Sequence, residues 1–599
     1  MSIFRRRLMG TSKKGSVIDM PNYMTIEALE DGLTATLTRN ACEYSIDGGE
    51  WVSLAAATST PAINAGHIIS FKANNPTVNS SYGIGTFTID KKCNLKGNCM
   101  SMLAYDDAAN MTTVKMYGFR TLFKNCTNIV NVEKGFLPAT TLNNHCYYQM
   151  FYGCSDLTIA PDLPATSLKS YCYRDMFHDC VSLTQAPELS ATTLNSGCYY
   201  GMFDGCSNLE TPPVVAASKL SASACRDMFN GCTSLTSTPS MNIKTIDSNT
   251  CRDMFSGCTN LISINITISV SYFYSYSCSG MFSGCNKLVD ASSLFDIDSS
   301  AVLGVACFEG MFSGCTELVG VPLLPSLNLA VECYSNMFAN CSSLVNVPKL
   351  PATTLAQSCY YGMFDGCKKI ESVVLPALEL VEDCYGQMFF GCKNLRYIKA
   401  LFLTTPSITY TSQWVYGVYQ NYGTFVKNID ATWNVSGDNG IPHNWTVVTV
   451  DDGGATNDNI NINLNGQWTE NDSISPDTSL YDAYESVSNV GVDNSEATMY
   501  ITINGLSSFT LYLRSNAESS YDYAMVSQLN ASIDGNTSTT SSDVKAHTKG
   551  KQNSGTSLSS YIEVVYDNIP SGDNVITVVY RKDSSQSSGT DKAYVLIPK

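Results

Sequence analysis

The sequence predicts a mainly β fold with short helices, organised as a solenoid of about 11 coils of ~26 residues. A small N-terminal β domain precedes the solenoid, and a C-terminal β-sandwich or jelly roll follows it. Two observations predict this architecture. A short phrase returns at nearly constant intervals through the middle of the chain, and both flanking segments alternate apolar and polar residues with a period of two. A content of 44% hydrophobic and 15% charged residues is typical of an ordered protein with a β-rich, hydroxyl-rich surface.

The recurring phrase is Met-Phe-x-Gly-Cys, and its closing cysteine marks each coil. A degenerate first copy closes at Cys126 and the last copy closes at Cys392. Successive closing cysteines lie 25 to 30 residues apart, most often 26, and a Leu or Ile follows three residues after nearly every one of them. Each copy therefore contributes a Phe, a Cys and a Leu to a shared core. In the first three complete copies these residues are Phe151, Cys154, Leu157, Phe177, Cys180, Leu183, Phe203, Cys206 and Leu209.

A single unit of this length cannot bury its apolar side chains, whereas stacked copies build a continuous core from identical columns. We expect a short strand after the Leu of each coil, ended by the proline of phrases such as Leu-Pro-Ala-Thr at 163–166. On the opposite side, we expect a single helical or 3₁₀ turn over the segment that leads into Met-Phe. Strands spaced ~4.8 Å apart would give a parallel sheet of roughly 50 Å along the stack.

The cysteines are numerous, and their spacing decides how they are interpreted. Of the 24, 21 lie in the repeats, and no Cys-x-x-Cys pair occurs, so zinc ribbons and thioredoxin-type sites have no support. The two cysteines of a coil are seven or eight residues apart, which is ~11 Å along a helical segment and beyond disulfide reach. We therefore expect buried free thiols, in keeping with a reducing cytoplasm. The alternative, a redox or metal ladder, has this spacing against it.

The repeats over about 117–400 resemble the BspA-like leucine-rich repeats. The resemblance rests on a Phe-x-x-Cys-x-x-Leu core, which Phe151, Cys154 and Leu157 and the equivalent residues of later copies carry. Members of that family are surface and adhesion proteins, often of gut anaerobes and of the phages that infect them. Residues 42–89 resemble the small β domain that precedes such repeats, and residues 516–599 resemble the terminal domain of large phage-encoded or surface proteins. The resemblance implies a leucine-rich-repeat solenoid in a non-enzymatic surface protein of the phage-encoded type.

The domain order follows from these patterns. We expect an N-terminal basic arm at 1–21, a β domain at 22–100, the solenoid at 101–400, its C-terminal cap at 401–449, a linker at 450–465 and the C-terminal β-sandwich at 466–599. The basic arm is interpreted as a disordered tail, with a docking arm for an acidic partner as the alternative. The cap segment keeps many aromatic residues, for which an aromatic binding patch is the alternative.

The sequence offers no catalytic constellation. Only five histidines occur, His145 and His178 occupy variable repeat positions, and no nucleophile elbow, zincin or P-loop motif is found. The acidic run at 451–454 does not meet calcium-loop spacing. We expect no catalytic residues, cofactor or metal. A glycan-active enzyme remains open only through the C-terminal domain.

Ligand-binding candidates lie in that C-terminal domain. Loop tyrosines with neighbouring charges offer the stacking faces and bidentate donors that sugars need. The candidate residues are Arg514, Tyr521, Asp522, Tyr523 and Arg581. The alternative is that the tyrosines are half-buried core residues of alternating strands.

Charge narrows the choice of partners. A formal net charge of −17 argues against nucleic acid or an anionic membrane as partner, and no apolar run is long enough for membrane insertion. No signal peptide is visible, so we expect synthesis in a cytoplasm without general export. The expected function is that of a phage virion fibre or decoration protein. It would contact other virion proteins through its N-terminal region and attach to a host-surface glycan or protein. The alternative is a bacterial cell-surface adhesin, and an oligomer is left open.

Overall fold

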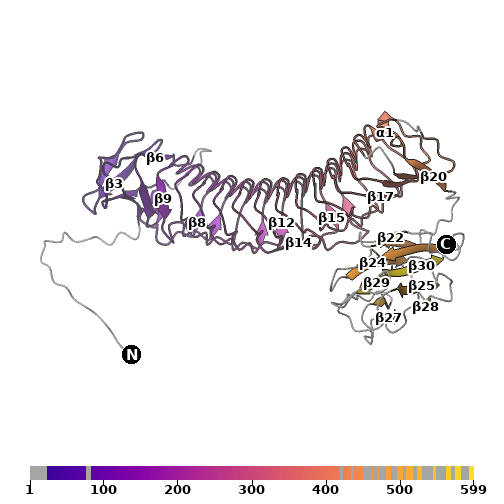
Figure 1. Ribbon diagram of the computed structural model, residues 1–599. Helices are drawn as coiled ribbons and strands as arrows, with labels where there is room; N and C mark the ends of the chain where they lie inside the picture. Colours follow the sequence, from indigo (N-terminus) through magenta and orange to yellow (C-terminus); the bar gives the residue numbers. More distant parts are fainter. Residues whose placement is uncertain are drawn as a thin grey trace, which may run out of the picture. The chain divides into compact units, whose positions relative to one another are not determined.

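The computed structural model describes residues 23–75, 83–418, 423–433 and 437–450, together with ten segments nearer the C-terminus. These segments are 460–463, 468–470, 481–486, 496–503, 508–516, 523–528, 544–547, 562–567, 574–581 and 592–598. The expected basic arm at 1–21 lies outside the described residues. The chain divides into two compact units, Met1–Val450 and Asp451–Lys599 (Figure 1).

The N-terminal β domain is joined to the solenoid through its main sheet. That sheet has the order β4 (Val52–Leu54), β3 (Cys42–Ile46), β5 (Ile68–Lys72), β1 (Met24–Ala28), β7 (Cys93–Lys96) and β9 (Ile129–Val132), and a smaller sheet pairs β2 (Ala35–Leu37) with β6 (Phe87–Ile89). Its last strand, β9, belongs to the first coil and runs parallel to β7. Phe87 stacks on Phe123 of that coil at 5.7 Å. The domain therefore covers the apolar face that the open end of a solenoid would expose.

The solenoid has about 13 turns, and its short strands pair in parallel between neighbouring coils. In β11 (Thr193–Leu194) and β12 (Lys219–Leu220), for example, Leu194 pairs with Leu220. Because the pairing offset equals the repeat length, equivalent side chains stack in columns. The other coil strands are β8 (Thr113–Val114), β10 (Thr141–Leu142), β13 (Met241–Ile243), β14 (Ile266–Ile268), β15 (Tyr272–Phe273), β16 (Val302–Leu303), β17 (Ser372–Leu375), β18 (Tyr397–Ala400), β19 (Thr424–Asn428) and β20 (Thr446–Val450).

The segment expected as a helical turn in each coil is instead a run of reverse turns. In the second coil φ is positive at every fourth residue, with values of 57° at His145, 53° at Gln149 and 70° at Gly153. A helix cannot include such residues. The third of these positions is the Gly of the repeat phrase, and where Gly is absent the chain has Asn125, Asp179 or Asn340, the residue types that best tolerate this conformation. Within the described residues, only η1 (Cys99–Met102) and α1 (Ile408–Thr411) are helical.

Hydrogen bonding explains why this run is stable without being a helix. Alternate N–H groups bond within the coil, as from Met150 to the carbonyl of Tyr147 at 3.2 Å. The intervening N–H groups donate to the next coil, as from Phe151 to the carbonyl of Met176 at 2.9 Å. Carbonyls alternate in the same way, so the backbone groups of this buried run find partners. The backbone of each turn run therefore donates to the following coil and accepts from the preceding one.

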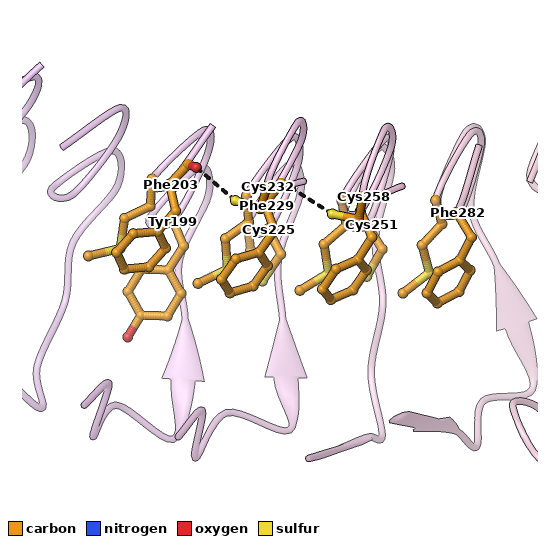
Figure 2. Packing of buried hydrophobic residues seen from close by; sticks show 14 of the residues in the cluster. Tyr199, Phe203, Cys225, Phe229, Cys232, Cys251, Cys258 and Phe282 are labelled. Carbon is orange, nitrogen blue, oxygen red and sulfur yellow. Dashed lines mark hydrogen bonds between the residues drawn. The ribbon is translucent and has the colours of Figure 1, made fainter. Parts of the chain in front are cut away.

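The core is a set of stacked columns, and one of them consists of the phenylalanines of the repeat phrase (Figure 2). Phe229, for instance, lies 5.6 Å from Phe203 and 5.3 Å from Phe255, with nearly parallel rings. The closing cysteines form a second column. The Cys232 thiol donates to the carbonyl of Phe203 in the preceding coil at 3.2 Å, and the same bond recurs along the stack. The repeat phrase therefore uses cysteine as a small apolar side chain that also satisfies a carbonyl.

All 24 cysteines are buried and free, as expected. Burial raises the pKa of nearly all of them, to about 12 for Cys126 and Cys251, so the reactive thiolate is suppressed. We expect the native chain to leave nearly all thiols unmodified by a thiol reagent at pH 8. Denaturation without reductant should then expose 24 thiols. A count well below this number in the denatured chain would reveal cystines and contradict the reduced core.

Residues 401–418, part of the segment expected as a cap, continue the coil geometry. The phrase Trp-Val-Tyr-Gly-Val at 414–418 takes the place of Met-Phe-x-Gly-Cys and ends 26 residues after Cys392. The Phe389 N–H donates to the Trp414 carbonyl at 2.8 Å, as preceding coils donate to Met. Gly417 keeps a φ of 72°. The turn runs end at a short loop, where Val415 donates to the Asp438 carbonyl at 3.3 Å, whereas the parallel strands continue through β19 to β20.

The second unit contains two antiparallel sheets of five strands each among its described residues. One has the order β21 (Ile460–Asn463), β24 (Glu496–Ile503), β29 (Asn574–Arg581), β26 (Tyr523–Ser527), β27 (Val544–His547), and the other β22 (Trp468–Glu470), β23 (Tyr481–Ser486), β30 (Lys592–Pro598), β25 (Ser508–Asn516), β28 (Ile562–Asp567). Met525, Val544 and Val579 form a buried cluster in the first sheet. Two sheets of this kind are what a β-sandwich is built from.

Candidate binding surface

The expected ligand-binding residues are distributed over both sheets of the second unit. Tyr521 and Asp522 lie outside the described residues. Tyr523 in β26 pairs directly with Arg581 in β29. Arg514 pairs with Tyr594 in β30, which belongs to the other sheet. The backbone thus brings Tyr523 and Arg581 together and places Arg514 elsewhere, and sugar binding at these residues stays a prediction.

The solenoid has a more organised surface that the sequence analysis missed. We call it the turn face: the outward side of the turn runs in the first six coils, from residue 117 to residue 257. One position of this face, two residues before the Met of the phrase, alternates between arginine and tyrosine. This tyrosine–arginine column consists of Arg120, Tyr148, Arg174, Tyr200, Arg226 and Arg252.

Cation–π contacts connect the column from coil to coil. The Arg120 guanidinium lies 4.6 Å from the centroid of the Tyr148 ring. Arg174 lies 4.2 Å from the Tyr200 ring and 5.7 Å from the Tyr148 ring. Arg226 lies 5.2 Å from Tyr200 on its other side. Because each ring is held between two guanidinium groups, the side chains are fixed in position before any partner arrives.

Further rings stack on both sides of this column. His145 lies between Tyr117 and Tyr171, with centroids 5.3 Å and 5.1 Å away. Burial, together with the charges of Arg120 and Arg174, lowers the pKa of His145, which favours a neutral ring at neutral pH. The histidine is therefore an uncharged part of an aromatic stack.

A second ring pair lies nearer the phrase glycine. His178 stacks on Tyr152 at 4.5 Å, and Lys124 lies 4.6 Å from the same tyrosine ring. His178 also lies 3.3 Å from an Asp179 carboxylate oxygen and 3.4 Å from one of Asp204. Aromatic, cationic and anionic groups thus alternate across neighbouring columns of the same face.

Carboxylates accompany the arginines. The Nε atoms of Arg226 and Arg252 each donate to the aspartate that follows them in the chain at 3.3 Å. Arg174 lies 3.4 Å from Asp175, close enough for an ion pair but not aligned for a hydrogen bond. The arginine side chains are about one third exposed, at 31 to 34%. Each of these side chains therefore presents part of its guanidinium group at the surface, next to the aspartate that follows it.

Charges on the turn face balance. Five basic residues (Arg120, Lys124, Arg174, Arg226 and Arg252) accompany five aspartates (Asp175, Asp179, Asp204, Asp227 and Asp253). None of the strongly exposed large apolar side chains of the described residues lies between 117 and 158 or in the turn runs of the following four coils. The face is polar, aromatic and electrically neutral.

Asp204 provides a test of this electrostatic arrangement. Burial, together with the charges of Asp227, Asp179 and Asp175, raises its pKa to about 6, although the charge of His178 acts to lower it. The ionised form is thus penalised in the folded chain, and the penalty disappears as the pH falls from about 6 to below 4. Asp204→Asn should stabilise the chain at pH 7.5, by less than about 1 kcal/mol because the site is partly screened, and leave stability unchanged at pH 4.

Thermal melts of the two proteins at both pH values measure this effect. The substitution is conservative, because the next coil has Asn230 at the equivalent position. A destabilised variant at pH 7.5 would show that the attraction between His178 and Asp204 outweighs the cost of burying the Asp204 carboxylate.

The sequence signal for the turn face was available. Aligning the coils on their closing cysteines shows Arg and Tyr alternating at one position through five successive copies. Such a pattern differs from the random variation of solvated positions. It was missed because the repeat analysis followed the positions that stay constant and not those that alternate.

None of the helices among the described residues has the length and apolarity needed to cross a bilayer. No group of three or more His, Cys, Asp or Glu side chains among the described residues is arranged to hold a metal ion.

Comparison with known proteins agrees with the coil geometry. Residues 174–307 and 308–409 match the family model described as BspA type Leucine rich repeat region, in six copies. No curated protein matches the chain. The leucine-rich-repeat solenoid of this chain is therefore similar, over residues 174–409, to BspA-type leucine-rich repeat regions.

Proposed function

We propose that this chain is a non-enzymatic attachment protein, and more specifically a fibre or decoration protein of a phage virion that binds a host surface through its solenoid. BspA-like repeats indicate a surface or adhesion-type repeat protein. The flanking segments resemble phage-encoded proteins of this type, and the basic residues near the N-terminus, such as Arg5, Arg6 and Arg7, offer a docking arm.

The observation that carries this proposal is the contrast between the interior and the exterior of the coils. The Phe, Met and Cys columns are nearly invariant and fully buried, whereas the outward position that holds Arg174 holds Tyr, Ser, Glu or Gly in other coils. A constant scaffold with a changing outer surface is the arrangement by which solenoids present binding surfaces. The organised turn face is the part of that surface with the most fixed geometry.

The virion location is tested by mass spectrometry of purified particles from the culture that produces the chain. Peptides from the repeats should be present at a constant ratio to the major structural protein. Washed cell envelopes from the same culture, without particles, serve as the control. Finding the chain in the envelopes and not in particles would overturn the virion proposal in favour of a bacterial surface adhesin.

Attachment is tested separately with the purified full-length chain. Fluorescently labelled chain should bind intact host cells in a saturable way and should be displaced by unlabelled chain. Incubation with host-surface polysaccharide should release no reducing ends, because the proposal assigns no catalysis to the chain. Absence of saturable binding would overturn the attachment role, and release of reducing ends would overturn the non-enzymatic one.

A further inference from the structure

We infer that the turn face binds an extended, uncharged polysaccharide that lies along the solenoid axis, with one sugar unit to each coil. The inference rests on the proposed attachment function and names the class of ligand and the residues that hold it. It concerns a different part of the chain from the C-terminal tyrosines and arginines considered first.

The geometry of the face suits a linear polymer. The ring centroids of Tyr117, His145 and Tyr171 follow one another at 5.3 and 5.1 Å, a repeat close to the ~4.8 Å spacing of strands. A sugar unit in an extended chain has a similar length, so successive units meet equivalent positions in successive coils. In Figure 1 the tightly wound side of the coils follows the concave edge of the solenoid, and concave solenoid surfaces accommodate elongated ligands.

The chemistry of the face suits hydroxyl groups. A sugar hydroxyl both donates and accepts a hydrogen bond, and at Arg226 and Arg252 guanidinium donors lie beside a carboxylate acceptor. Tyrosine faces in the column are covered by arginines, so the rings offer their edges. Because the cation–π contacts already fix these side chains, little conformational entropy is lost on binding.

The same observations disfavour the other classes of partner. Protein interfaces have an apolar centre, and the turn runs of the first six coils contain no strongly exposed large apolar side chain. Such residues border these runs at Met116 and Val181 and occur in later coils, including Tyr272, Tyr274 and Val302 at 45, 44 and 40% exposure. An anionic polymer needs a net positive face, and here five basic residues meet five aspartates.

The site has a defined length. After Arg252 the column position is taken by Ser279, Glu309 and Ser335, and the alternation of rings and guanidinium groups ends. Five steps between six coils correspond to ~24 Å, so we infer a ligand segment of about six sugar units. Shorter oligosaccharides should bind progressively more weakly.

The test uses the full-length chain and affinity electrophoresis in gels containing one soluble polysaccharide each. The neutral panel consists of a mixed-linkage glucan, a glucomannan, a xylan, a mannan and a galactan, and polygalacturonate provides the acidic arm. The site variant is Tyr148→Ser, Arg174→Ser and Tyr200→Ser together, which later coils tolerate because they carry Ser279 and Ser335 at this position. The control variant, Tyr272→Ser with Tyr274→Ser, removes an exposed tyrosine pair elsewhere.

At least one neutral polysaccharide should retard the intact chain, and the site variant should bind it at least about tenfold more weakly. The control variant should bind like the intact chain, and circular dichroism should show both variants folded. Retardation by no neutral polymer, salt-sensitive binding of polygalacturonate alone, or equal binding by the site variant would each overturn the inference.

Cell attachment separates this inference from the proposed function. If intact chain and site variant bind host cells equally, attachment stands and the turn face is not its site. If the intact chain does not bind cells at all, the proposed function itself fails.

Discussion

Raising the pH from 8 to 10 is expected to unfold the solenoid. All 24 cysteines are buried thiols, and burial raises the pKa of nearly all of them, to about 12 for Cys258 and Cys315. In the unfolded chain a thiol ionises near ~8.5. Above that pH the unfolded state releases protons that the folded state retains, so stability is fully present below it and is lost as pH rises.

The loss of folding stability from thiol ionisation is large enough to unfold the chain. Each thiol that ionises only in the unfolded chain costs about 1.4 kcal/mol of stability for each pH unit above its unfolded pKa. Folded proteins are stable by only ~5–15 kcal/mol. About ten such thiols would therefore consume that stability near pH 9.5, and the repeats contain 21. The melting temperature should fall steeply above pH 8.5.

Thermal melts followed by circular dichroism between pH 7 and 10, with reductant in every sample, measure this dependence. Returning samples from pH 10 to pH 7.5 should restore the fold, which separates titration from chemical damage. A melting temperature that stays level between pH 8 and 10 would mean that the thiols are accessible in the folded chain or absent as thiols from the unfolded one.

Phe229→Ala is the single substitution expected to have the largest effect on stability. Phe229 is completely buried in the middle of the phenylalanine column, 5.6 Å from Phe203 and 5.3 Å from Phe255. Its carbonyl accepts the Cys258 thiol at 3.1 Å. Removing the ring leaves a cavity between two coils and should lower the free energy of unfolding by about 3–5 kcal/mol.

The position of the change should also alter how the solenoid unfolds. Solenoid stability is a sum of coil and interface terms, so a weak interface in the middle uncouples the two halves. Urea unfolding of Phe229→Ala should become broader or show two steps, whereas Phe229→Leu should shift a single transition by less. A single transition displaced by under about 1 kcal/mol would show that neighbouring coils collapse into the cavity.

The solenoid could be predicted because its determinants are periodic. The core columns can be identified in the sequence itself from the recurrence of Phe151, Cys154 and Leu157 in later copies. The family match agrees with this assignment over residues 174–409. The turn run was predicted less well, because a short apolar segment cannot be told from a helical turn by its pattern alone. Only the positive φ values at positions such as His145 and Gln149 distinguish the two.

The coil that contains Trp414 illustrates a second limit. Trp414 and Val418 replace the Met and Cys of the phrase, so the Met-Phe-x-Gly-Cys pattern ends before this coil. The Met and Cys positions of the phrase require apolar side chains of suitable size. The position just before the closing residue requires one able to adopt the φ of 72° found at Gly417. The turn face was missed for the opposite reason, because its signal lies in the alternation of outward residues and not in their constancy.

The one-directional hydrogen bonding of the turn runs gives the solenoid a chemical polarity. At the N-terminal end the Phe87 N–H donates to the Leu122 carbonyl at 2.7 Å. At the C-terminal end the side-chain oxygen of Asn439 accepts a hydrogen bond from the Gln413 N–H at 2.7 Å. The two terminal elements are thus not interchangeable, because one supplies a hydrogen-bond donor to the stack and the other supplies an acceptor. Two bare stacks would be complementary head to tail, and these closures cover the hydrogen-bonding groups through which such end-to-end pairing would occur.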